Sequence, residues 1–286
     1  MDDLGSVTGI GGDDASPVSR PELNFSASSA GLITKYLYAH GCVLLRGAIP
    51  NQKVIAYRDA LESIYERYDH ALIDPNVKRD FDEFSKDEFD GVSRGDVSPQ
   101  MFAKFSGLDV VRLFADRKLE EVFSRTMGGY QPVLTTFMSV APSAAHSSTG
   151  ISLHADGIVQ GTDRFITCLW TPFQPCGVDA PGLAVMTVPR EKVLAYLQYK
   201  FPTRQIPGWS SMTEWNDTGA FEVKELFRAF GHDKLWNPAM EPGDVMLFTN
   251  WTIHGSNVTR SMTKRRSAAI LRLTATGSPA TRGISG

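Results

Sequence analysis

The sequence predicts a mainly β protein with flanking helices, and two observations carry this prediction. From residue 131 onward, apolar residues recur with a period near two instead of about 3.6. Clusters of Gly, Pro, Asp and Ser separate the resulting short segments. Many short strands with turns between them favour a sandwich or a barrel over a βαβ sheet. The candidate strands are 132–140, 151–157, 165–173, 183–188, 244–250 and 266–274.

The N-terminal third of the chain predicts a helical layer. Residues 1–22 are rich in Gly, Asp, Ser and Pro and should form a loose tail, so one domain should span residues 23–286. A helix should begin at Ser28 or Ser29 and end at Gly41, because these residue types cap and stop helices. A strand over 42–46, a helix over 51–68 and further helical periodicity over 108–127 should follow.

Two stretches differ from the rest of the chain. Residues 74–100 combine many Asp and Glu with Phe, which is typical of a solvated acidic loop or of a flap over a ligand. Residues 190–240 interrupt the strands with two expected helices and many aromatic residues. The predicted layout is therefore a helical layer, a β core and a helical insertion at about 190–240.

Composition and charge exclude several functional classes. The net charge of −3 attracts the whole chain neither to nucleic acid nor to anionic lipid. No apolar run approaches the 18 or so residues that a membrane span needs, and the acidic, Gly-rich N-terminus is unlike a signal peptide. Cys42, Cys168 and Cys176 lack the spacing of a zinc knuckle and should be buried free thiols. We therefore expect a cytoplasmic protein that binds neither nucleic acid nor membrane.

One histidine has neighbours that suggest a metal site. On a strand, residues two apart project from the same face, so His154 and Asp156 should point into one space. His254 follows the predicted strand at 244–250 and precedes a glycine. Two imidazoles and one carboxylate on one side of a metal leave three positions open, as in non-haem Fe(II) oxygenases. A structural zinc would instead be closed by four protein ligands.

An arginine follows His254 by eleven residues. Arg265, Ser267 and Ala269 should share one strand face, with small side chains leaving room near the guanidinium. Arg266 and Arg272 should then lie on the opposite, solvent-facing side. A guanidinium facing a cavity suits bidentate capture of a carboxylate.

The order His154-X-Asp156, His254-Gly-Ser256 and then Arg265 resembles the phytanoyl-CoA dioxygenase family of Fe(II)/2-oxoglutarate oxygenases. The segment from Tyr38 to Pro50, Cys168-Leu-Trp-Thr-Pro and Pro242-Gly-Asp-Val are also similar to stretches of that family. The resemblance runs from about residue 32 to 275. The sequence departs from the family at Val188-Pro-Arg-Glu, where a Pro-Gly-Ser-His-type turn is usual.

The resemblance implies a fold, a cofactor and roles for single residues. The fold would be a double-stranded β-helix, a jelly roll of the cupin type. His154, Asp156 and His254 would hold Fe(II), and 2-oxoglutarate would chelate the iron and react with O₂. Arg265 would pair with the distal carboxylate of 2-oxoglutarate, assisted by Ser256. Three further residues would lie near this co-substrate: Thr135, Ser139 and Trp170.

The expected activity is oxidation of an unactivated C–H bond of a small molecule, with release of succinate and CO₂. Since halogenating relatives lack the carboxylate, Asp156 favours hydroxylation, and desaturation, epoxidation and ring chemistry stay open. The aromatic-rich insertion favours a specialised metabolite or an amino-acid derivative as substrate. Two alternatives remain from the residues alone: a Zn- or Mn-dependent hydrolase or isomerase with the same three ligands, and a non-catalytic binding protein on this fold. The sequence does not predict the oligomeric state.

Overall fold

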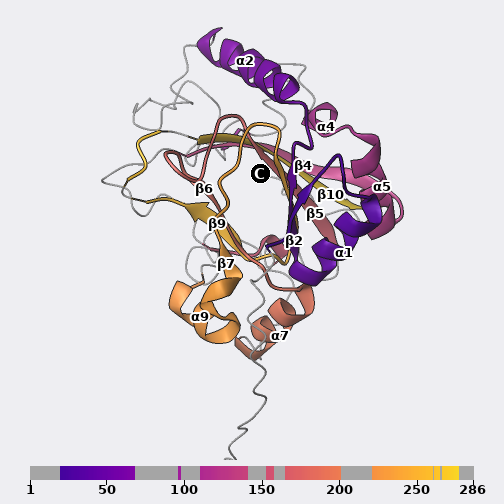
Figure 1. Ribbon diagram of the computed structural model, residues 1–286, viewed down its shortest axis with the longest axis vertical. Helices are drawn as coiled ribbons and strands as arrows, with labels where there is room; N and C mark the ends of the chain where they lie inside the picture. The colour runs from indigo at the N-terminus through magenta and orange to yellow at the C-terminus, as the bar shows by residue number, and fades with distance from the viewer. Residues whose placement is uncertain are drawn as a thin grey trace, which may run out of the picture.

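The computed structural model of the chain has a β core of two sheets with helices around it (Figure 1). The structure describes residues 20–67, 96–97, 110–140, 153–157, 165–200, 221–259, 261–264 and 266–276. The larger sheet has seven strands in the order β1-β2-β8-β5-β10-β4-β3. The smaller sheet has three strands in the order β7-β6-β9. The mainly β class with flanking helices is therefore confirmed.

The strands of the larger sheet are β1 (Glu22–Asn24), β2 (Cys42–Arg46), β3 (Asp96–Val97), β4 (Tyr130–Val140), β5 (Ile166–Pro172), β8 (Val245–Thr249) and β10 (Arg266–Ala275). Those of the smaller sheet are β6 (Gly182–Met186), β7 (Leu235–Trp236) and β9 (His254–Asn257). Apart from the parallel pair β1–β2, neighbouring strands pair antiparallel. This agrees with the sandwich-like arrangement that the short strands predict.

Helices α1 (Ala30–His40), α2 (Asn51–Arg67), α4 (Val110–Leu113) and α5 (Arg117–Met127) make up the N-terminal layer. The Ser29 hydroxyl accepts a hydrogen bond from the backbone N–H of Leu32, and Gly41 ends α1 in the left-handed conformation. A side chain at Gly41 would also meet the carbonyl oxygen of Val188 at 2.5 Å. The predicted helix from Ser28 or Ser29 to Gly41 is thus confirmed.

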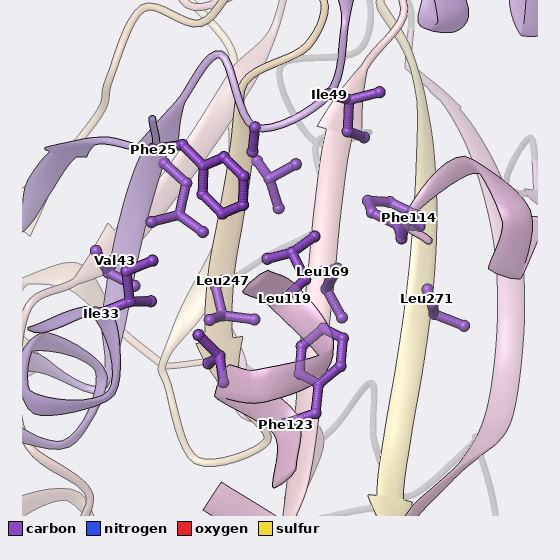
Figure 2. Packing of buried hydrophobic residues seen from close by; sticks show 14 of the residues in the cluster. Phe25, Ile33, Val43, Ile49, Phe114, Leu119, Phe123, Leu169, Leu247 and Leu271 are labelled. Carbon is purple, nitrogen blue, oxygen red and sulfur yellow. The ribbon is translucent and has the colours of Figure 1, made fainter. Parts of the chain in front are cut away.

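An apolar cluster joins this helical layer to the outer face of the larger sheet (Figure 2). Ile33 of α1 and Leu119 and Phe123 of α5 pack against sheet residues such as Leu247 and Leu271. Each of these side chains is at most 3% exposed. Burying a side chain of this size contributes about 1.5–3 kcal/mol, so the cluster fixes the helices on one side of the sheet. The opposite face of the larger sheet packs against the smaller sheet.

A second cluster fills the space between the two sheets. It combines Cys168 and Trp170 of β5 and Ile270 of β10 with Leu183 and Val185 of the smaller sheet. Along β2, β5, β8 and β10, alternate residues belong to this inner cluster and to the outer one. The larger sheet is therefore buried on both faces.

The predicted insertion contains helices α7 (Arg190–Lys200) and α9 (Val223–Phe230), which lie below the sheets in Figure 1. They contribute Val193, Leu197 and Leu226 to a third cluster with Trp251 and Ile253 of the segment before β9. The two helices expected between residues 190 and 240 are confirmed. They support the backbone that leads into His254.

Three sequence-based expectations need comment. The predicted strand 151–157 is wrong where it is described, because only His154 of residues 153–157 makes a β-bridge and residues 156–157 are helical. Residues 20–22 belong to the fold and not to a tail, since Glu22 begins β1 and pairs with Leu44. The acidic stretch 74–100 lies outside the described residues except for β3.

The three cysteines are free and buried, as expected. Burial raises the pKa of Cys42 to about 12 and that of Cys176 to about 11, so both stay protonated thiols near neutral pH. Among the described residues, no helix combines the length and the apolar character needed to cross a bilayer.

Candidate metal centre

His154, Asp156 and His254 meet in one buried group. Their candidate ligand atoms all lie within 4.8 Å of one another. The Oδ1 atom of Asp156 is 3.4 Å from Nε2 of His154 and 4.0 Å from Nε2 of His254. Two donors that each bind one ion at about 2.1 Å can be at most about 4.2 Å apart, so both distances suit a shared metal. No other such group of three occurs among the described residues.

The backbone brings the two histidines together. His154 and His254 form an isolated antiparallel bridge, in which each N–H donates to the other residue's carbonyl oxygen at 2.8 Å. The two imidazole rings are tilted, with their centres 4.3 Å apart. Pairing across this bridge therefore places His154 beside His254.

The tautomer of His254 is fixed by its neighbour. Nδ1 of His254 lies 2.9 Å from the backbone carbonyl oxygen of Thr252. A carbonyl oxygen only accepts, so Nδ1 carries the hydrogen and Nε2 keeps its lone pair. Burial, with a smaller effect from His154, lowers the pKa of His254 to about 3. A neutral imidazole with a lone pair at Nε2 is the form that binds a metal.

The two oxygens of Asp156 have different surroundings. Oδ1 faces the two imidazoles, whereas Oδ2 accepts a hydrogen bond from Nε of Arg272 at 2.8 Å. The thiol of Cys168 lies 3.7 Å from the same Oδ2 atom. Burial by itself would raise the pKa of Asp156, but the Arg272 guanidinium and the two histidines hold it well below its usual range. The carboxyl group is therefore an anion that offers one oxygen to a cation.

The donor set fits a divalent transition metal. Two imidazoles and one carboxylate form the group, and no cysteine belongs to it. This combination is the facial arrangement typical of non-haem Fe(II), with three coordination positions open. A structural zinc site would have a fourth protein ligand, which the described residues do not supply.

Gly157 permits a close approach between the residue after Asp156 and Trp251. Its N–H donates to the carbonyl oxygen of Asn250 at 2.6 Å, and its Cα faces the ring of Trp251. A Cβ atom at residue 157 would lie 2.6 Å from Cε2 of Trp251. The segment that precedes His254 therefore packs directly against the residue that follows Asp156.

Gly157→Ala should reduce stability by about 1–3 kcal/mol, because the added methyl overpacks against Trp251. It should also weaken metal binding, since Asp156 or the loop before His254 must move. Gly31→Ala is the matched control, because a Cβ there meets only the Ser29 hydroxyl oxygen at 3.9 Å. Chemical denaturation and metal titration of both variants measure the two effects. Equal stability and metal affinity in Gly157→Ala and the parent would contradict this packing.

The expectation that Arg266 and Arg272 face solvent is wrong. Arg266 and Arg272 were expected to face solvent, but Arg266 is 0% exposed and Arg272 bonds Asp156. The Arg266 guanidinium lies over the ring of Trp170 at 5.1 Å and donates to the carbonyl oxygen of Gly182 at 3.4 Å. Arg265 lies outside the described residues. Arg266 and Arg272 therefore both lie on the inner face of β10, together with Ala268 and Ile270.

Four other residues were expected near the co-substrate, and the structure describes the side chains of two of them, Trp170 and Ser256. Trp170 is buried in the inner cluster, and half-buried Ser256 lies two residues after His254 in β9. Thr135 pairs with Leu271, and Ser139 pairs with Ser267. The side chains of Thr135 and Ser139 lie outside the described part of the chain, and their role stays a prediction.

Comparisons with known proteins point to one family. The model of the phytanoyl-CoA dioxygenase (PhyH) family matches residues 37–267, most of the chain. No curated protein matches at a significant level. The match includes all three candidate ligands as well as Arg266.

Three solved structures share the fold at low sequence identity. AviO1 from Streptomyces viridochromogenes Tue57 has a TM-score of 0.52 and 12% identity, over 88% of this chain and 98% of its own. EvdMO1 has a TM-score of 0.52 and 13% identity, over 86% of this chain but only 50% of its own. SnoK is described as a non-heme alpha-ketoglutarate-dependent carbocyclase from nogalamycin biosynthesis. It has a TM-score of 0.55 and 12% identity, over 92% of this chain and 90% of its own.

The family match, the shared fold and the His-Asp-His group agree with one another. The chain belongs to the phytanoyl-CoA dioxygenase family.

Proposed function

We propose that this chain is a non-haem Fe(II)/2-oxoglutarate-dependent dioxygenase that oxidises an unactivated C–H bond of a small molecule. The observation that carries the proposal is the buried group of His154, Asp156 and His254, with one carboxylate oxygen and a neutral imidazole directed at a common point. When bound there with 2-oxoglutarate and O₂, iron supplies the oxidation and releases succinate and CO₂. The protein would bind the iron and 2-oxoglutarate, orient the substrate and exclude water from the site.

Arg266 is the residue that we assign to the distal carboxylate of 2-oxoglutarate. Its guanidinium is fully buried and lies over Trp170. Trp170 is two residues from Cys168 on the same strand face, and Cys168 touches Asp156. A line of contacts therefore leads from the guanidinium to the metal ligands. A fixed, desolvated guanidinium is well suited to a carboxylate, which it binds with two parallel hydrogen bonds.

The family supports a proposal for the fold type and for further co-substrate residues. We assign the two sheets to a double-stranded β-helix, in which the inner cluster excludes water from the metal ligands. Ser256 would assist Arg266, because it shares a strand face with His254. Thr135 and Ser139 remain candidates for the same co-substrate.

The substrate that we propose is a specialised metabolite or an amino-acid derivative. The aromatic residues of the insertion favour apolar bulk, and the shared fold with SnoK, a carbocyclase of nogalamycin biosynthesis, is in keeping with such a molecule. Hydroxylation is the reaction that an intact carboxylate ligand favours. SnoK's description as a carbocyclase keeps ring chemistry open on this fold.

The proposal is tested by incubating the Fe(II)-loaded protein with 2-oxoglutarate, ¹⁸O₂ and fractionated metabolite extracts. Mass spectrometry should detect succinate and a product that carries one ¹⁸O atom, or one that has lost two hydrogens. The His254→Ala variant is the control and should give neither. Substrate conversion that needs Zn²⁺ or Mn²⁺ but no 2-oxoglutarate would favour a hydrolase or isomerase instead.

A further inference from the structure

We propose that Arg272 is a positioning residue that reserves a single oxygen of Asp156, Oδ1, for the metal, with help from Cys168. The inference deepens the proposed function and rests on it for the identity of the metal centre. The sequence pattern predicts that Arg272 faces solvent, whereas the structure pairs it with Asp156.

The contacts of the carboxylate carry the first step. Nε of Arg272 donates to Oδ2 of Asp156 at 2.8 Å, and the side chains are only 12% and 7% exposed. The Cys168 thiol is 3.7 Å from the same oxygen. At this distance the thiol can donate a weak hydrogen bond to Oδ2. Both neighbours therefore engage the oxygen that faces away from the imidazoles.

The strand register shows why these two residues act together. Cys168 of β5 pairs directly with Arg272 of β10, and Phe248 of β8 pairs with Cys168. Phe248 packs against the ring of His254, with the ring centres 4.6 Å apart. One row of residues across the larger sheet therefore supports both Asp156 and His254. The supporting residues stand on strands, where packing holds their positions firmly.

The consequence concerns the number of open coordination positions. A carboxylate that chelated through both oxygens would take a fourth position on a six-coordinate metal. Only two positions would then remain, whereas a bidentate co-substrate and O₂ together need three. By engaging Oδ2, Arg272 keeps Asp156 a ligand through one oxygen.

Charge alone does not account for this contact. A cation beside a metal site repels the metal ion, so a purely electrostatic role for Arg272 would weaken metal binding. A hydrogen bond that orients a ligating carboxylate has the opposite effect, and loss of such partners typically costs about 10–100-fold in metal affinity. The two explanations make opposite predictions.

The experiment compares Arg272→Met with Arg272→Gln. Both remove the charge, but Gln places an amide N–H at the position of Nε, whereas Met places a methyl group there. Co²⁺ is the probe, because its d–d absorption changes with coordination number, and it is titrated without 2-oxoglutarate or substrate. Arg272→Met should bind Co²⁺ about 10–100-fold more weakly than Arg272→Gln and show a changed spectrum. Arg272→Gln should keep the spectrum of the parent.

Equal affinities and equal spectra of the two variants would overturn the inference. If Arg272→Met does not fold, Arg272→Gln decides alone, because a spectrum unlike that of the parent would then be the contradicting result. Arg125→Met is the control, because Arg125 is an exposed arginine of α5 that pairs with Glu121, and its Co²⁺ affinity should match that of the parent. A chain that shows this dependence on Arg272 but consumes no 2-oxoglutarate would refute the proposed function and leave the inference standing.

Discussion

Alanine at His154, Asp156 or His254 should lower iron-dependent turnover by more than about 100-fold, beyond the loss typical of residues that only support ligands. Each residue supplies one of three donors, and a metal held by two of them would bind weakly and in the wrong geometry. Succinate release per protein chain at a fixed Fe(II) concentration, measured by mass spectrometry, tests this expectation.

The control for these variants is His40→Ala. His40 ends α1, which packs on the outer face of the larger sheet, so its loss should leave succinate release within about twofold. Because removal of Asp156 strands the Arg272 guanidinium, Asp156→Asn provides a version that keeps the shape of the side chain. Near-normal turnover in a folded variant of any one ligand would show that the residue does not bind the metal.

Arg266→Ala should raise the KM for 2-oxoglutarate by about 30-fold or more. Removing one partner of a desolvated, charge-assisted pair costs about 2–5 kcal/mol, and each factor of ten corresponds to about 1.4 kcal/mol. Arg266→Lys should recover only part of the affinity, because an ammonium group cannot form the planar pair. Steady-state kinetics at saturating Fe(II) measure both variants.

Arg265→Ala decides between the two assignments of the co-substrate arginine. The sequence favours Arg265, whereas the structure buries Arg266 over Trp170. If Arg265→Ala gave the larger increase in KM, the assignment made from the structure would be wrong.

The three candidate metal ligands could be predicted from the sequence, because their chemistry is specific and local. An imidazole and a carboxylate two residues apart, followed by a second histidine after a strand, combine the donor types that Fe(II) prefers. The strand on which we expected His154 and Asp156 to share one face is nevertheless absent from the described part of the chain. His154 forms only an isolated bridge, and its partner in that bridge is His254 itself.

The strand face of the arginines could not be predicted in the same way. Strand β10 is buried on both sides, with Ala268 and Ile270 in the inner cluster and Ala269 and Leu271 in the outer one. A strand with two apolar faces has no polar alternation that would tell its inside from its outside. The alternation of small residues along β10 therefore could not show that Arg266 and Arg272 are enclosed, and the role of Arg265 stays a prediction.

The contact between Arg272 and Asp156 was missed for a related reason. The two residues are 116 positions apart, and the contact depends on the pairing of β5 with β10. A signal was available, since an arginine amid the apolar run of a predicted core strand requires a partner. The pairing of β5 with β10 is needed to show that this partner is Asp156, one of the three candidate metal ligands.

The measurement that tests the central claim most directly is the stoichiometry of O₂ and 2-oxoglutarate consumption by the Fe(II)-loaded protein. An oxygen electrode and ¹⁴CO₂ release from 1-¹⁴C-labelled 2-oxoglutarate should report one CO₂ for each O₂ consumed. Both signals should disappear when Zn²⁺ replaces Fe(II) and in the His254→Ala variant. A protein that binds Fe(II) at His154, Asp156 and His254 but releases no CO₂ from 2-oxoglutarate, with or without substrate, would contradict the account.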